Sequence, residues 1–395
     1  MSRKTRTIAL VTSALGCHSR AFCEGAAEYV RRNCGWMVRL VLCEELRSAE
    51  MLRSCDGIIA RELGAREYDI LEKCGRPVVE AAVRESRSHR FPSVDCDERA
   101  IGRLAAEHFL KRGFTSFAFC GFPSRVDFSD AREQYFCESL EERGLTVRRY
   151  PTGTPCFLGG PYSPDLVVPG PDDELAEWAQ GLPKGTGVFC ANDVMARQLL
   201  CTCIERRISV PGDLAILGVD NDLLFCNLNA PGLSSVDPNA RGIGAAGAEL
   251  LLRILSGKED AVKGAHLDAQ PGGVVVRAST EVYRMGPPWL SDALVEIDRN
   301  AETLTASDVY RLVRKSHTAV DGAFSEFLRT TVQKRILAVR MEEAKTLLEG
   351  AKTPVADIAK SLGFPSAQYF SSTFKLHFNA TPAAYRRARR AHAQG

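Results

Sequence analysis

The chain has 395 residues, and because single hydrophobic cores stop growing near ~250–300 residues, two or more domains are expected. Hydrophobic residues make up 45% of the sequence and charged residues 25%, which excludes a chain that is mostly disordered, fibrous or of low complexity. No apolar stretch approaches the ~18 residues that a membrane span needs, and the basic start runs straight into a strand pattern, so neither a membrane anchor nor a secretory signal is expected.

The net charge of +2 is unevenly distributed. From Gly286 onward, 16 Lys and Arg stand against 11 Asp and Glu, a net charge of +5, so the preceding part carries −3. A basic C-terminal module on a mildly acidic larger part favours a polyanionic partner for the tail end alone.

Fourteen cysteines lie between Cys17 and Cys226, with no C-x-x-C pair. Such scatter through a long chain predicts small buried thiols in a reducing compartment, here the cytoplasm, and no metal site.

Short apolar runs alternate with helix-like stretches from Thr7 onward. Fully apolar strands between amphipathic helices are typical of a parallel sheet covered on both faces, so the sequence predicts an α/β architecture. Residues 151–171 are rich in Pro, Gly and Thr and are expected to form an irregular crossing. The alternation then resumes, with strands such as GVFC and LAILGV and helices such as VMARQLLCTCIERR, and ends at Thr280.

Two prolines and a glycine in RMGPPWL, residues 284–290, mark the domain boundary. We therefore predict a domain at residues 1–284, a linker at 285–290 and a second domain at 291–395. The second domain is expected to be all-helical, with one long helix at about 331–348. On that helix Leu337, Met341, Ala344 and Leu348 form one apolar stripe. Thr305 and Asp308, three residues later, predict a capping box at the start of a helix. Thr353 and Thr381 are also expected to cap helices, because each is followed by a proline at the first helical position.

Residues 353–376 read as two short helices joined by a turn at Gly363, which is a helix-turn-helix pattern with Phe370 and Phe374 facing inward. A poorer version of the pattern occupies residues 304–328. The connecting helix of about 18 residues spans ~27 Å, close to the ~34 Å between successive major-groove faces. One chain could therefore read two consecutive grooves.

The segments ADIAKSLGF, QYFSSTFK and ATPAAYRR, within Gly350–Arg387, resemble the C-terminal signature of AraC/XylS-type transcription regulators, and the match extends back to about Leu290. The resemblance implies that the second recognition helix presents five residues to DNA: Ser366, Ala367, Gln368, Tyr369 and Ser372. Gln368 is the best base reader, because an amide can bond adenine bidentately. Tyr369 could instead pack in the core.

The first motif would present His317, Thr318, Asp321 and Gly322, where the family usually offers Arg, Lys or Gln at the later two sites. Asp321 would repel phosphates, so this motif is expected to position the protein more than to specify sequence. Arg386 and Arg387, with Arg389 and Arg390, form a terminal cluster suited to phosphate contact or, alternatively, a solvated basic tail.

Upstream, CANDVMARQLL and RRISVPGDLAILGVDND resemble the effector-binding core of LacI/GalR-type regulators, with supporting matches at LSSVDPN and VVVRAST. The resemblance covers residues 5–282 and implies a two-lobed periplasmic-binding-protein-like domain without the family's N-terminal DNA-binding headpiece. It implies a small sugar or polyol bound between the lobes, with Arg132, Asn192 and Asp220 as leading contacts and Asp193 and Asp97 next. Asn192 and Asp193 could instead cap the next helix, and Arg132 could be a surface charge. Whether the loop around His18 and Arg20 faces the ligand stays open.

Together these features predict a sequence-specific DNA-binding transcription regulator controlled by a small sugar, with no catalytic residues and no cofactor. The combination of a LacI/GalR-like sensor with an AraC/XylS-like reader suggests xylose as the sugar. The composition of the chain does not favour xylose over any other pentose or hexose. The expected partners are operator DNA, the sugar, a second copy of the chain and, for an activator, RNA polymerase.

Two other functional classes compete with this interpretation. Gly242, Gly244 and Gly247 satisfy G-x-G-x-x-G and would suit an NAD-dependent oxidoreductase, but the motif follows no buried strand and reads better as close helix packing. A transport-associated binding protein would have no use for a helical DNA reader.

Overall fold

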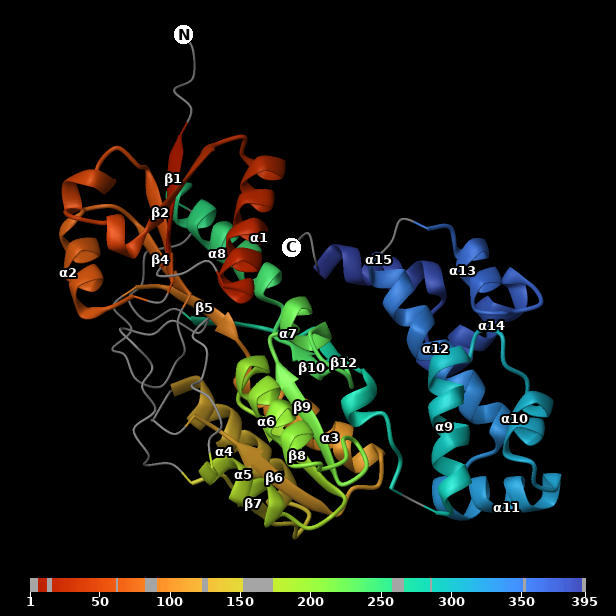
Figure 1. Cartoon of the computed structure of the whole chain (residues 1–395). Helices are drawn as coiled ribbons and strands as arrows, with labels where there is room; N and C mark the ends of the chain where they lie inside the picture. The colour runs from red at the N-terminus through yellow and green to blue at the C-terminus, as the bar shows by residue number, and fades with distance from the viewer. Residues whose placement is uncertain are drawn as a thin grey trace. The chain divides into compact units, whose positions relative to one another are not determined.

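The computed structural model describes residues 6–12, 16–61, 63–81, 91–122, 127–151, 173–257, 266–284, 286–350 and 353–392. The chain forms two compact units, Met1–Glu281 and Val282–Gly395, shown from red to teal and from teal to blue in Figure 1. The irregular crossing expected at 151–171 lies almost entirely outside the described residues. Among the described helices, none is long and apolar enough to cross a membrane.

The first unit contains two six-stranded sheets (Figure 1). The first sheet has the order β11-β5-β4-β3-β1-β2, with β1 Thr7–Thr12, β2 Met37–Leu42, β3 Gly57–Arg61, β4 Val78–Ala81, β5 Ser93–Cys96 and β11 His266–Ala269. The second sheet has the order β12-β10-β9-β8-β6-β7, with β6 Ser116–Cys120, β7 Val147–Arg149, β8 Thr186–Cys190, β9 Leu214–Val219, β10 Ser234–Asp237 and β12 Gly273–Val275. Every described strand pair is parallel except β10 with β12.

Eight α-helices accompany these strands in the described part of the first unit: α1 Cys17–Asn33, α2 Ala65–Lys73, α3 Glu98–Lys111, α4 Asp127–Glu141, α5 Asp173–Gln180, α6 Asp193–Glu205, α7 Leu223–Asn227 and α8 Ala240–Leu255. Short 3₁₀ helices lie at η1 Cys43–Glu45, η2 Ala49–Leu52 and η3 Ala278–Thr280. The α/β prediction is confirmed: central strands such as β8 and β9 are buried at every residue, as a sheet covered on both faces requires.

The chain passes between the two sheets three times, after β5, after β10 and after β11. These crossings bind one another: the backbone N–H of Asp97 donates to the carbonyl of Ala269, and Asn239 Nδ2 donates to the carbonyl of Gln270 at 3.1 Å. Gln270 Nε2 in turn donates to Asp97 Oδ2 at 3.0 Å. The crossings therefore form one hydrogen-bonded hinge between the two halves of the first unit.

The G-x-G-x-x-G match lies in the first two turns of α8, which pairs closely with α1. A Cβ on Gly244 would collide with the carbonyl oxygen of Phe22, and one on Gly25 would collide with that of Arg241. Gly242 sits against its own N-cap residue, Asn239. Gly25 and Gly244 therefore allow the backbones of α1 and α8 to approach, which supports the helix-packing interpretation. The motif lies within a helix and provides no phosphate-binding turn after a strand.

The second unit is helical throughout its described residues. Its helices are α9 Pro288–Asn300, α10 Ala306–Val313, α11 His317–Leu328, α12 Val332–Gly350, α13 Val355–Ser361, α14 Ala367–Phe378 and α15 Pro382–His392. Helix α9 begins at Pro288, inside the range 285–290 that was predicted to be a linker. Tyr283 packs in the same apolar cluster as Leu290 and Leu294, so the second unit starts earlier than expected.

Two apolar clusters hold the second unit together. One joins α9 to α10, α11 and the start of α12; the other joins the rest of α12 to α13 and α14. The predicted stripe is confirmed, with Met341, Ala344 and Leu348 fully buried and Leu337 partly so. The Thr305–Asp308 capping box is also present. The cap predicted at Thr353 is wrong, because Pro354 occupies the N-cap position of α13 without a side-chain hydrogen bond.

Candidate functional sites

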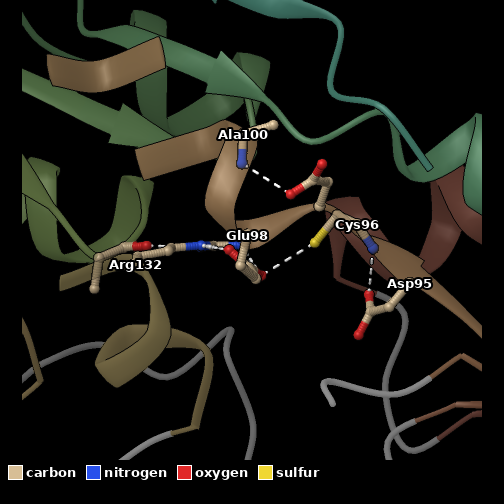
Figure 2. Close-up of polar contacts among 7 residues, drawn as sticks. Asp95, Cys96, Glu98, Ala100 and Arg132 are labelled. Carbon is tan, nitrogen blue, oxygen red and sulfur yellow. Dashed lines mark hydrogen bonds and ion pairs between the residues drawn. The ribbon is translucent and has the colours of Figure 1, made fainter. Parts of the chain in front are cut away.

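Arg132 on α4 and Glu98 at the start of α3 form a buried ion pair (Figure 2). Arg132 Nε donates to Glu98 Oε2 at 2.8 Å and Nη2 donates to Oε1 at 3.2 Å, while Nη1 donates to the carbonyl of Ala191 at 2.6 Å. The two side chains are 5% and 9% exposed, so Arg132 is not a surface charge. A forked pair in this setting holds the guanidinium in one orientation.

Asp95 and Cys96, at the end of β5, extend this polar group (Figure 2). The Cys96 thiol donates to Glu98 Oε1 at 3.0 Å, and the Cys96 backbone N–H donates to Asp95 Oδ1 at 2.8 Å. Burial raises the pKa of Asp95 to about 6, although Arg61, at the end of β3, favours its charged form. Sequence reasoning missed Asp95, Glu98 and Arg61; the one signal was that each stands at or just after the carboxyl end of a strand.

Asp220 follows β9 and adopts a φ of +107°, a left-handed conformation that non-glycine residues rarely take. Its backbone N–H donates to the carbonyl of Val236. Burial raises the pKa of Asp220 to about 6, while the positive charges of Arg132 and Arg61 lower it. Arg132 and Asp220, two of the leading predicted contacts, are thus close enough to perturb each other.

The other predicted contacts use their side chains within the fold. Asn192 caps α6, its Oδ1 accepting from the Met195 N–H at 3.1 Å. Asp97 caps α3 and belongs to the hinge. Asp193 is buried and accepts from the Ser235 hydroxyl at 2.7 Å and the Asp222 N–H at 2.8 Å, and burial raises its pKa to about 8. Asn192 is therefore a helix cap, as the alternative interpretation expected, while Asp193 stabilises the turn that follows β9 by accepting hydrogen bonds from it.

Helix α1, which follows the first strand of the first sheet, faces the same charged group. His18 lies in the first turn of α1, and Arg20 on that turn is exposed, so the segment expected to be a loop is helical. Burial, with the charges of Arg61 and Arg132, lowers the pKa of His18 and keeps the imidazole neutral. Its buried Nδ1 has no hydrogen-bond partner among the described residues. The thiol of Cys17 has its pKa raised by burial and by Asp220 and Asp222.

Residues at the ends of strands and on helices thus meet in one polar group, with members from both halves of the first unit. The group contains carboxylates, guanidinium groups and a neutral imidazole. Such a group can pair with the hydroxyls of a small polar ligand, donors with acceptors. No disulfide joins the cysteines in the described ranges, and no cluster of three or more metal-ligating side chains occurs among those same residues.

In the second unit, α14 is the helix predicted to read DNA. Ser366 caps it by accepting from the Tyr369 N–H at 3.1 Å, so its hydroxyl is used within the protein. Gln368 and Ser372 are exposed, and Ala367 is half-buried. Tyr369 is 56% exposed and touches Phe364 with its ring, so it lies at the surface rather than in the core. Helix α14 contains Lys375 and no acidic residue.

The first motif differs in charge and in local contacts. Helix α11 carries Asp321 and Glu326 and no Lys or Arg. His317, Thr318, Asp321 and Gly322 are all exposed on it. The Tyr310 hydroxyl donates to Asp321 Oδ1 at 2.9 Å, and the Tyr310 ring stacks on His317 with centroids 4.1 Å apart. The hydrogen bond from Tyr310 therefore holds Asp321 through Oδ1, while Oδ2 accepts no hydrogen bond from the part of the chain that the structure describes.

The C-terminal basic cluster is divided. Arg386 donates to the carbonyl of Thr353 at 2.7 Å and is half-buried, so it ties α15 to the start of α13, whereas Arg387 is exposed. The side chains of Arg389 and Arg390 lie outside the described residues.

Comparison with known proteins identifies both units. The family of periplasmic binding protein-like domains matches residues 106–280, and the family of helix-turn-helix domains matches residues 311–388. The chain is 27% identical to the xylose operon regulatory protein of Haemophilus influenzae over 98% of this chain and 99% of the relative. It is 28% identical to that of Escherichia coli K12, over 98% of each.

Among solved structures, the xylose-binding transcription activator xylR matches with a TM-score of 0.60 and 27% identity over 98% of this chain and 99% of the other. A periplasmic binding protein/LacI transcriptional regulator from Alkaliphilus metalliredigens, solved with D-xylulofuranose, matches 70% of this chain and 99% of its own at a TM-score of 0.55. At 18% identity it shares the fold of the first unit. The chain is a DNA-binding transcription regulator that joins a periplasmic-binding-protein-like domain to an AraC-type helix-turn-helix domain.

Proposed function

We propose that the chain regulates transcription in response to a small sugar bound in its first unit, with xylose the first candidate. The observation that carries the proposal is the convergence of Arg132 on α4, Asp220 after β9 and His18 on α1, which come from both halves of the first unit. Full-length relatives named for the xylose operon make a pentose the first sugar to test.

The proposed contacts are Arg132, Asp220 and the amide of Asn192. To these the structure adds His18 from α1 and Arg61 from β3. Arg132 retains N–H groups beyond those given to Glu98 and Ala191. The cap formed by Asn192 uses its Oδ1, and among the described residues its Nδ2 has no hydrogen-bond partner. Asp193 and Asp97 are proposed to support the site without touching the sugar: Asp193 binds the turn after β9, and Asp97 belongs to the hinge.

A thermal-shift screen of the full chain against pentoses and hexoses tests the ligand. A sugar at 100 times its Kd stabilises the native state by about 2.7 kcal/mol, which gives a readable rise in melting temperature. D-xylose is expected to produce that rise, and Asp220→Asn is expected to remove it. A screen in which no sugar shifts the transition contradicts the proposal.

For the second unit, the proposal is that α14 reads bases and α11 adds contacts in the neighbouring groove. At 19 residues and 1.5 Å per residue, α12 is about 28 Å long, which approaches the ~34 Å between groove faces. The exposed Gln368, Tyr369 and Ser372 supply the polar face. Selection of DNA from a random pool tests this, because the chain should enrich one bipartite sequence. Enrichment of no sequence contradicts it.

The proposed role is regulatory rather than enzymatic, and the proposed location is the bacterial cytoplasm, where the DNA is. By analogy with LacI/GalR-type regulators, the first unit is proposed to form a homodimer, and an activator would also contact RNA polymerase. Sedimentation of the full chain, alone and on a selected DNA duplex, distinguishes a dimer from a monomer.

A further inference from the structure

Arg277 lies between β12 and η3, four residues before the end of the first unit. The only covalent connection from the first unit to the DNA-binding unit leaves directly after η3, at Glu281. Whatever holds residues 277–281, the exit segment, therefore fixes where the DNA-binding unit is attached.

Buried hydroxyls fasten the exit segment to the second sheet. The Ser279 hydroxyl donates to the carbonyl of Ile216 in β9 at 2.6 Å, and the Thr280 hydroxyl donates to Ser234 Oγ in β10 at 2.7 Å. His108 Nε2 lies 2.8 Å from the Thr280 hydroxyl; because Arg112 donates to the other ring nitrogen, Nε2 is the donor. Ser234, Ser279 and Thr280 are fully buried, so each of these contacts is shielded from water.

The Arg277 side chain joins this segment to the candidate sugar site. Its Nη2 donates to Asn221 Oδ1 at 2.7 Å, and its Nη1 donates to the carbonyl of Leu233 at 2.8 Å. Its backbone N–H donates to Ser234 Oγ at 2.7 Å. Arg277, the first residue of the exit segment, thus contacts both the turn after β9 and the start of β10.

Asn221 is the neighbour of Asp220 in a turn of unusual backbone. Asp220 and Asn221 have φ values of +107° and +48°, so two successive residues hold left-handed conformations. The Asn221 N–H donates to Ser235 Oγ at 2.9 Å, and Ser235 donates to Asp193. Side chains around the turn keep it in place, and a ligand on Asp220 acts directly on that turn.

We propose that Arg277 is a positioning residue that couples sugar binding at Asp220 to the DNA-binding unit through its hydrogen bond to Asn221. The inference rests on the proposed function. The coupling is assigned to one hydrogen bond between the turn after β9 and the exit segment. The sugar site and the DNA-binding unit then both act on the exit segment, and allosteric coupling requires such a shared element.

The test compares DNA affinity with and without D-xylose, using a duplex that the wild-type chain selects from a random pool. Allosteric coupling factors are typically ~5–150-fold. Arg277→Met should reduce the wild-type factor to less than about 2-fold while D-xylose affinity stays within about 3-fold. Arg148→Met, an exposed arginine on β7, is the matched control and should keep the full factor.

Asn221→Gly breaks the same bond from the other side and keeps the left-handed backbone, so it should reproduce Arg277→Met and serves if that variant fails to fold. Asn221→Asp keeps the acceptor and should keep the coupling. A folded Arg277→Met or Asn221→Gly chain with the full wild-type factor overturns the proposal.

A wild-type chain whose DNA affinity ignores D-xylose would refute the proposed function instead. The bond itself is then judged by hydrogen exchange without sugar. Amides of residues 277–283 should exchange at least about 10-fold faster in Asn221→Gly than in the wild type, with β8 unchanged. Equal exchange in both chains overturns the role of Arg277.

Discussion

Replacing Arg132 by methionine should destabilise the first unit strongly, because it leaves Glu98 buried without its cation. The pair is forked, with N–O distances of 2.8 and 3.2 Å. Two unit charges ~3–4 Å apart attract by about 4–6 kcal/mol at an effective dielectric constant of 20. Removing one partner of a buried pair costs about 3–5 kcal/mol, so a loss of that size in the free energy of unfolding is expected.

The double variant Arg132→Met with Glu98→Gln separates the charge from the lost packing. It removes both charges, so it should recover at least about 2 kcal/mol relative to Arg132→Met alone. The matched control is the pair Arg103–Glu107, whose side chains are 66% and 35% exposed and whose atoms lie 4.0 Å apart. Breaking that pair should cost less than about 1 kcal/mol.

Urea unfolding with pulsed hydrogen-exchange labelling follows peptides of the first unit separately from those of the second. A loss below about 1 kcal/mol for Arg132→Met would show that Glu98 finds water or another cation. A double variant that loses the sum of both single losses would refute the buried ion pair as the source of the effect.

Four further outcomes are expected. Gln368→Ala should weaken binding to selected DNA by about 1–3 kcal/mol and relax preference at one base, and a loss equal on all sequences would assign Gln368 to the backbone. Asp321→Asn should change the preference in the first half of the site from cytosine toward adenine, because a carboxylate accepts from cytosine N4 and an amide pairs with adenine; an unchanged selected sequence argues against base contact. Phe374→Ala should lower the free energy of unfolding of the second unit by about 3–5 kcal/mol in urea titrations, since its buried ring contacts Phe370, Phe378 and Tyr385. Folding raises the pKa of Asp95 from 3.8 to about 6, so the native state binds the proton more tightly, and the contribution of Asp95 to the free energy of unfolding falls as pH rises between those values. Between pH 4 and pH 7 the free energy of unfolding of Asp95→Asn should therefore rise by about 2–3 kcal/mol relative to that of the wild type. Parallel curves of unfolding free energy against pH would contradict this.

The sequence predicted the second unit in most of its detail. Phe370 and Phe374 face the core, Met341 and Leu348 lie on one stripe, and the Thr305 box caps α10 as expected. These features repeat along single helices, so local spacing determines them. Thr353 failed as a cap because the fixed φ of Pro354 suits the N-cap position as well as the first helical one.

The first unit was predictable in class but not in its site. Three strands, β5, β10 and β11, carry polar residues and gave no apolar run to find. Glu98 stands 34 residues from Arg132, and only the pairing of α3 with α4 brings them together. The family resemblance suggested Asp193 and Asp97 as further contacts. Within the fold, Asp193 accepts from the Ser235 hydroxyl and Asp97 accepts from the Ala100 N–H, partners that the spacing of residues along the chain does not reveal.

The DNA affinity of the full chain, measured with and without D-xylose, decides whether the chain is a sugar-responsive regulator. Such a regulator should bind a selected duplex at least about 10³-fold more tightly than random DNA, and D-xylose should change this affinity by at least about 5-fold. Equal affinity for selected and random DNA, or an affinity that no sugar changes, would contradict it.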